Sequence, residues 1–128
     1  MFNRIILIGN LTRDPEIRYT PSGVAVATVP IAVNSRYRQG EEMREETLFI
    51  DAVVFGKQAE TCTQYLNKGR TVLVEGRLRE RRWEYEGQKK SKFEVIASNI
   101  RFLSKRESAE PHDNEQMPPD EYTDLEPF

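Results

Sequence analysis

One segment of this sequence combines positive charge with aromatic rings at a regular spacing. Arg77, Arg79, Arg81 and Trp83 stand at every second position, and Tyr85 follows them. In a strand, residues two apart point to the same face, so these side chains would form one row. Guanidinium groups bind phosphates and flat rings stack on unpaired bases, which is the chemistry of single-stranded nucleic-acid binding. A charged row can also be an ordinary solvated face, but a tryptophan within it favours a binding surface.

Further rings extend this pattern. Phe49 and Phe55 share one face of the alternating segment 47–55, and Tyr37 stands between two arginines. The other face of that segment looks like core, because it carries the apolar residues Leu48, Ile50, Ala52 and Val54. A slip of one residue in this assignment would exchange the faces and bury both phenylalanines. We expect Tyr37, Phe49 and Phe55 to contribute to binding.

The residue inventory argues against catalysis. With one cysteine, Cys62, and one histidine, His112, the chain has no internal disulfide, no histidine-based metal site and no familiar nucleophile–base pair. Cys62 and Tyr65 recur at helical spacing and are expected to pack in the core. The glutamates within residues 41–46 are typical of a solvated hairpin tip rather than of a metal site. We therefore expect a protein that is not an enzyme, with no catalytic residue, no metal and no cofactor.

Charge is distributed unevenly along the 128 residues. All 19 lysines and arginines lie at or before Arg106, against 13 acids there, whereas residues 107–128 carry eight acids and no base. The latter segment also holds four prolines and too little apolar surface to offset its ordering entropy. We expect one basic domain over residues 1–106 and a disordered acidic tail over residues 107–128. The sequence offers no apolar run typical of a membrane span or a secretory signal, so we expect a cytoplasmic protein.

The elements that would position these residues follow from periodicity and turn signals. Extended segments rich in β-branched residues cover 5–8, 24–34, 47–55, 71–85 and 91–103. The first stops at Gly9-Asn10, where we expect a kink or bulge, and the alternation of the last slips phase between Ala97 and Ile100. Residues 57–68 change to helical spacing, with Gly69 where a C-terminal cap belongs. This order predicts a mainly β fold, a five-stranded Greek-key barrel of the OB type with one helix between strands three and four.

Several separate motifs, in a fixed order, resemble those of the bacterial single-stranded DNA-binding protein family over about residues 1–105. They are the opening segment 1–11, Asp14-Pro15-Glu16, Arg18-Tyr19, Val54-Phe55-Gly56-Lys57, Tyr65-Leu66, Lys68-Gly69 and the segment 74–78 leading to Trp83. The acidic tail is also similar to that of the family, since it ends in acids, an aliphatic residue, Pro127 and Phe128. The resemblance implies an OB fold, a homotetramer and sequence-independent binding of single-stranded DNA in replication, recombination and repair. It also implies association with the nucleoid and a tail that recruits replication and repair proteins.

Position by position, the resemblance assigns roles to particular residues. It implies stacking rings at Tyr37, Phe49, Phe55 and Trp83, with Tyr85 next to the last of them. It implies phosphate contacts at Arg4, Lys57, Lys68, Arg79, Arg81 and Arg82, and a partner-binding tip at Asp124, Leu125, Glu126, Pro127 and Phe128. The chain departs from the family where relatives often have tryptophan, at Tyr37 and Phe49, and in the order of Leu125 and Glu126.

Other functions compete with this interpretation. A basic, aromatic OB sheet also suits a translation or tRNA-binding factor, although such a factor has no evident use for a tail ending in Pro127-Phe128. An enzyme is disfavoured by the residue inventory, and a primosome or organelle relative would be expected to lack the tail. Leu73, an apolar residue on the outward face of its strand, indicates burial between subunits.

Overall fold

The computed structural model describes residues 1–103, which form six strands and one helix. The elements in chain order are β1 (Ile5–Leu11), β2 (Glu16–Tyr19), β3 (Ala25–Gln39), β4 (Glu42–Phe55), α1 (Lys57–Tyr65), β5 (Thr71–Tyr85) and β6 (Gln88–Phe102). The expected acidic tail and the domain boundary at residue 106 lie outside the described residues. No helix in the described part of the chain is long and apolar enough to span a bilayer.

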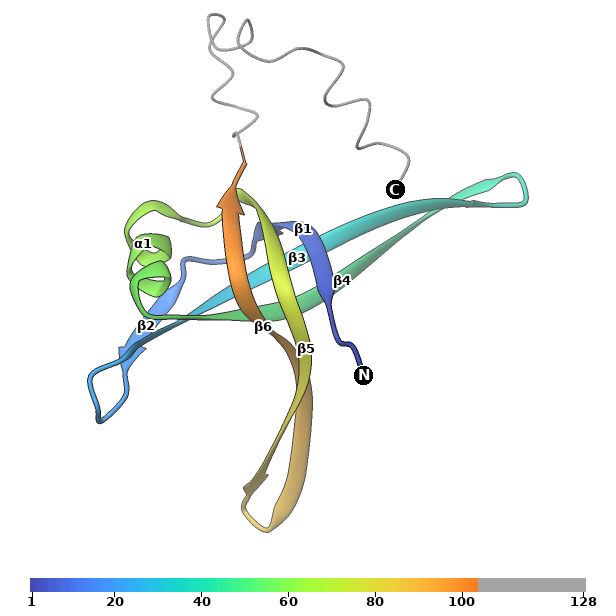
Figure 1. Cartoon of the computed structure of the whole chain (residues 1–128). Helices are drawn as coiled ribbons and strands as arrows, with labels where there is room; N and C mark the ends of the chain where they lie inside the picture. The colour runs from blue at the N-terminus through green and yellow to red at the C-terminus, as the bar shows by residue number, and fades with distance from the viewer. Residues whose placement is uncertain (104–128) are drawn as a thin grey trace, which may run out of the picture.

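Five of the strands close into a barrel. The sheet runs in the order β1-β5-β6-β4-β3, and β3 returns to pair with β1 (Figure 1). All these pairs are antiparallel except β4 with β6, which is parallel. The prediction of a five-stranded barrel with one helix between the third and fourth barrel strands is confirmed. Sequence analysis missed β2, a four-residue strand on the outer edge of β3 that is too short to show a periodicity.

The core consists of small and β-branched side chains that face the barrel interior. The largest of the fully buried residues are Val29, Ile31, Val54, Val72, Val74 and Val95, together with Cys62 from the helix. Ala59, Cys62 and Leu66 carry α1 onto the barrel. Burial raises the pKa of the Cys62 thiol to about 11, so this group is neutral at physiological pH.

The helix is shorter than the sequence predicts. It ends at Tyr65, and Leu66 after it is already extended, so the cap expected at Gly69 is wrong. Gly69 instead takes a left-handed conformation in the turn before β5. The expected packing of Cys62 is confirmed, but that of Tyr65 is wrong, because its side chain is 56% exposed.

β1 continues through Gly9 rather than ending there. Gly9 pairs with Val72 of β5, and the next residue, Asn10, pairs with both Thr71 of β5 and Ala32 of β3. A Cβ atom on Gly9 would lie 2.6 Å from the carbonyl oxygen of Ala32. Glycine is therefore required by the close approach of two strands where the barrel closes.

A β-bulge explains the change of phase in the last strand. Gly76 pairs with Ala97 but Glu75 pairs with Asn99, so Ser98 is the extra residue of β6. The Ser98 hydroxyl donates a hydrogen bond to the carbonyl oxygen of Glu75 at 3.1 Å. The bulge lets Ala97 and Ile100 both face the core, which confirms the phase slip that the sequence predicts.

The outer halves of four strands leave the barrel as two arms. The β3–β4 hairpin and the β5–β6 hairpin project in different directions from the barrel (Figure 1). The second arm is closed by Glu86 and Gly87, which both have positive φ, as a type I′ hairpin turn requires. Nearly all residues of both arms are exposed, so each arm offers two accessible faces.

The close approaches at the glycines predict a loss of stability on substitution. Gly9→Ala and Gly76→Ala should each lower the free energy of unfolding by about 1 to 3 kcal/mol, because the new Cβ meets backbone that has to shift. At Gly76 the Cβ would lie 2.1 Å from the carbonyl oxygen of Ile96, so its effect should be at least as large. Chemical denaturation measures both.

Ser35→Ala, at an exposed position of β3, is the control and should change the stability by less than about 0.5 kcal/mol. Equal stability of the glycine variants and the wild type would contradict the steric explanation.

Candidate nucleic-acid interface

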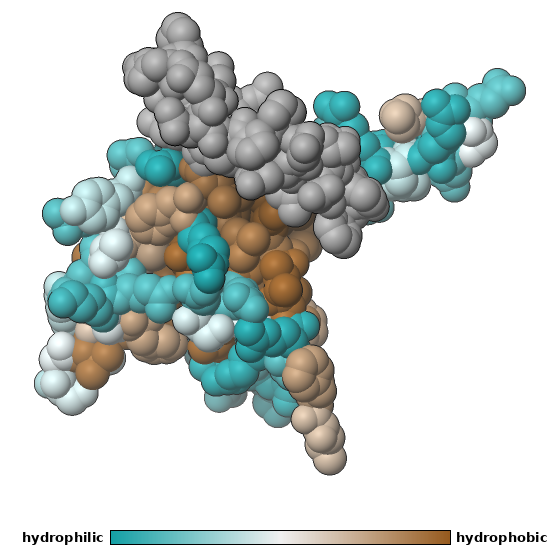
Figure 2. Space-filling model, turned by 45° about the horizontal axis from the view of Figure 1, so that its top comes forward, coloured by the Kyte–Doolittle hydropathy of each residue, from teal (hydrophilic) through white to brown (hydrophobic). Residues whose placement is uncertain are grey.

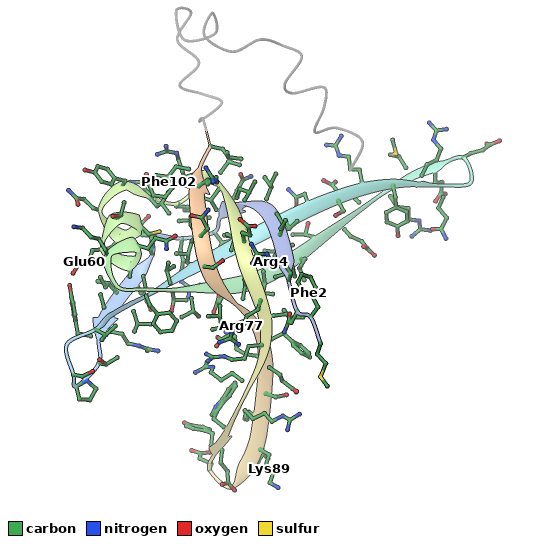
Figure 3. All side chains as sticks on the ribbon, viewed as in Figure 1. Phe2, Arg4, Glu60, Arg77, Lys89 and Phe102 are labelled. Carbon is green, nitrogen blue, oxygen red and sulfur yellow. The ribbon has the colours of Figure 1, made fainter. Side chains whose placement is uncertain are left out.

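The outward face of β5 carries the row of residues that the sequence predicts. Arg79 and Arg81 both reach the carboxylate of Glu94, and the Arg81 guanidinium carbon lies 4.8 Å from the centroid of the Trp83 ring. Arg77 marks the point where the β5–β6 arm leaves the barrel, and Lys89 lies near the tip of the arm (Figure 3). The row therefore runs from the barrel wall along one face of the arm.

Glu94 is the one buried charged residue among residues 1–103, with 3% of its surface exposed. Nε of Arg79 donates a hydrogen bond to Oε2 of Glu94 at 3.2 Å, and Nη2 of Arg79 donates to the same oxygen. Nε of Arg81 lies 3.7 Å from the other carboxylate oxygen, Oε1. Two guanidinium groups thus compensate one buried carboxylate, which would otherwise be costly to remove from water. Sequence analysis did not single out Glu94.

The same outward face continues across β6 onto β4. Nζ of Lys92 donates a hydrogen bond to Oδ2 of Asp51 at 2.8 Å, which links β6 to β4. Phe49, two residues before Asp51, is 71% exposed, and Phe55 is also exposed. Both phenylalanines are outside the core, as expected. Leu48, which the alternation places in the core, is exposed as well, because β4 has already left the barrel at this residue.

The rings are spread along the molecule rather than gathered in one pocket. Tyr37 is exposed and pairs with Arg44 in an unbroken β3–β4 register, in which Ala32 pairs with Phe49. Alternation along β3 therefore puts Tyr37 and Phe49 on opposite faces of that hairpin. Phe49 and Phe55 are six residues apart on β4, about 20 Å of extended chain. Such spacing suits contact with an extended polymer.

Of the other cations assigned by the resemblance, Arg4 lies at the barrel end of this face, whereas the two lysines lie away from it. Arg4 forms an ion pair with Glu75 at 2.5 Å. Lys57 begins α1 and Lys68 follows it, so both lie beside the helix and away from the β5–β6 arm (Figure 1). Both lysines are exposed and would extend a binding path to the helix side of the barrel.

Arg82 lies on the opposite face of β5 from Arg81. Its Nη2 donates a hydrogen bond to Oε1 of Glu80 at 2.7 Å. This hydrogen bond is the main reason why the pKa of Glu80 is lowered and that of Arg82 is raised, so both groups are ionised at neutral pH. Tyr85 is exposed at the end of the arm, on the face of Trp83 by alternation.

Two apolar features lie outside the set that the sequence assigns to binding. Phe93 continues the inward series of Val95 on β6 but is 57% exposed, because the arm has left the barrel there. It lines a groove of about 500 Å³ with Leu48 and Ile50 of β4. On the barrel, Ile6 and Ile8 of β1 are exposed. Apolar side chains are likewise exposed on the barrel body in Figure 2, whereas the β3–β4 arm is mainly hydrophilic.

Comparison with known proteins identifies relatives of the whole described region. The model of the single-strand binding protein family matches residues 2–103. A single-stranded DNA-binding protein of Treponema pallidum is 46% identical over 101 residues, which cover 79% of this chain and 57% of the relative. A single-stranded DNA-binding protein of Aquifex aeolicus is 44% identical over 122 residues, covering 93% of this chain and 83% of the relative. The chain thus spans less than two thirds of the Treponema protein.

A solved structure is similar to this chain in fold and in sequence. The SSB of Plasmodium falciparum, in complex with ssDNA, superposes with a TM-score of 0.76 at 33% sequence identity. The match covers 81% of this chain and 96% of the Plasmodium chain. The similarity therefore extends over the barrel and both of its arms.

Proposed function

This chain belongs to the single-strand binding protein family, and we propose that it binds single-stranded DNA without regard to base sequence. The observation that carries the proposal is the row of Arg77, Arg79, Arg81 and Trp83 on the exposed face of β5, which continues toward Phe49. Cations along this row neutralise phosphates, and the rings stack on bases. Neither contact distinguishes one base from another. Membership of a family of binding proteins agrees with the expectation that the chain is not an enzyme.

The geometry favours unpaired over paired nucleic acid. In a duplex the bases are stacked on one another and offer no free face to Trp83 or Phe49, whereas a single strand exposes every base. The rings are also far apart along the sheet, so a flexible strand reaches more of them than a rigid duplex does. The competing translation or tRNA-binding function has no separate support in these features.

A separate apolar patch on the barrel is compatible with self-association, and we propose a homotetramer. Ile6 and Ile8 are exposed on β1. Leu73 of β5 pairs with Ile8 and is partly exposed. Contiguous apolar side chains of this kind are typical of a face buried between subunits. Assembly would place several DNA-binding faces on one particle. Such a particle would protect and organise strands exposed in replication, recombination and repair, next to the nucleoid in the cytoplasm.

The acidic segment 107–128 is proposed to recruit partner proteins. Its sequence supports this role, because Asp124 and Glu126 would supply charge at the rim of a basic pocket while Phe128 enters it. Leu125 and Pro127 complete the proposed tip. The same eight acids would compete with DNA phosphates for the arginine row of the domain.

Trp83→Ala should weaken binding of oligo-dT by about 1 to 3 kcal/mol, the usual cost of losing one base–aromatic stack. Trp83 is the only tryptophan in the chain, so quenching of its fluorescence on titration with oligo-dT reports binding by the wild type. Because Trp83→Ala has no tryptophan, the affinities of the variants and the wild type are compared through the fluorescence anisotropy of a labelled oligo-dT. Parallel titrations with duplex DNA and oligo-U test the preference for single strands and for DNA. Tyr65→Ala removes an exposed ring at the end of α1 and should leave the affinity unchanged. Equal binding by Trp83→Ala and the wild type would refute stacking at this site.

Arg77→Ala and Arg82→Ala remove the same charge from opposite faces of β5. Among residues 1–103, no ion pair involves Arg77, whereas Arg82 is paired with Glu80. If the outward face binds phosphates, Arg77→Ala should reduce the slope of log affinity against log salt by about 0.7 for a single strand. Arg82→Ala should change it much less, and dT and dC oligomers should behave alike. Equal slopes for the two variants would mean that both faces of the arm contact DNA.

Deletion of residues 107–128 should tighten DNA binding at low salt, because it removes acids that compete for the arginines. The gain should fade as salt screens the charges. Deletion of Phe128 alone should leave DNA affinity unchanged and abolish capture of replication and repair proteins. Capture that is the same with and without Phe128 would contradict the recruitment role.

A further inference from the structure

We propose that Glu94 is a positioning residue for DNA binding, which holds the Trp83 ring in its stacking orientation through Arg81. The inference rests on the proposed function, since it concerns the same outward face of β5. It assigns a role to a buried acid in the middle of a surface that is expected to bind an anion.

The contacts form a continuous path from the barrel wall to the ring. One carboxylate oxygen of Glu94 accepts two hydrogen bonds from Arg79, and the other lies 3.7 Å from Nε of Arg81. The Arg81 guanidinium in turn lies over the Trp83 ring, 4.8 Å from its centroid. Glu94 is fixed because its strand is paired on both sides, with Arg79 of β5 and Asp51 of β4. A residue whose strand is paired on both sides is thus connected to the exposed ring.

Glu94 interacts with Arg79 and Arg81, whereas the neighbouring Lys92 is paired with another acid. Lys92 lies opposite Arg81 in the β5–β6 register, but its ammonium group binds Asp51 on β4 instead. Asp51 and Glu94 therefore hold different cations, although they are direct neighbours across β4 and β6. Each acid fixes the cations on its own side of the face.

Charge alone would make Glu94 unfavourable for this function, because a carboxylate repels DNA phosphates. Its benefit must therefore come from geometry. A free arginine samples many rotamers, and a surface whose side chains are already held in place loses less conformational freedom when DNA binds. Neutralising Glu94 consequently separates the two effects by the sign of the change in affinity. Loss of repulsion tightens binding, whereas loss of positioning weakens it.

The test is Glu94→Gln, which keeps the size of the side chain and removes its charge. We expect the affinity for oligo-dT to fall by about tenfold, within the range of coupling between residues in contact. The emission of Trp83 in the DNA-free protein should shift as well, because the guanidinium over the ring is released. Glu84→Gln removes the same charge from the opposite face of β5 and should not weaken binding. An affinity of Glu94→Gln that is equal to or higher than that of the wild type would overturn the inference.

A second variant decides the question if Glu94→Gln does not fold, as judged by circular dichroism. Arg81→Lys lies at an exposed position, keeps the positive charge and removes the planar group over Trp83. It should shift the Trp83 emission and weaken oligo-dT binding with an unchanged salt slope. If both variants fold, their combination should bind no more weakly than Glu94→Gln alone, because both break the same path. Unchanged emission and affinity of Arg81→Lys, or fully additive losses, would overturn the proposal.

The outcomes also separate this inference from the proposed function. If the wild type does not bind oligo-dT, the proposed function fails, together with the inference that rests on it. If the wild type binds and Glu94→Gln binds equally well, the function stands and only the positioning role is lost.

Discussion

The fold depends on the backbone contact between β1 and β3 at Gly9. Asn10, the next residue, pairs with Thr71 of β5 and with Ala32 of β3, so a single strand joins the two ends of the sheet. A side chain at residue 9 would occupy the space of the Ala32 carbonyl group. With this closure the barrel strands have no free edge at that point, and a core of modest valine and isoleucine side chains is enclosed on all sides.

The closed barrel supports two arms that have no core of their own. The strands β3, β4, β5 and β6 have 14 or 15 residues each, and only about half of each strand carries the buried residues of the barrel. An isolated two-stranded hairpin is at best marginally stable in water, so the arms depend on the barrel at their base. In return, both of their faces are accessible, and rings and guanidinium groups can reach a ligand without opening of the structure.

Local periodicity predicts much of this arrangement. It fails where the burial or the partners of a residue depend on segments that are distant in the sequence. The row from Arg77 to Trp83 and the change of phase between Ala97 and Ile100 follow from alternation, which neighbouring residues express on their own. Leu48 and Phe93 have the inward phase but are exposed, because the point at which a strand leaves the barrel depends on its partner strands. The ion pairs of Glu94 depend on the β5–β6 register, which the sequence of a single strand does not contain.

The turn of the β5–β6 arm also constrains how this surface changes length during evolution. Tyr85 and Gln88 pair across the two residues Glu86 and Gly87, so each position of β5 has a fixed partner on β6. Insertion of one residue between the barrel and Trp83 would rotate the ring to the opposite face. Two additional residues in each strand would keep the ring on its face and lengthen the arm by about 7 Å. A change of length between the barrel and Trp83 therefore keeps the ring on its face only if it comes in steps of two residues per strand.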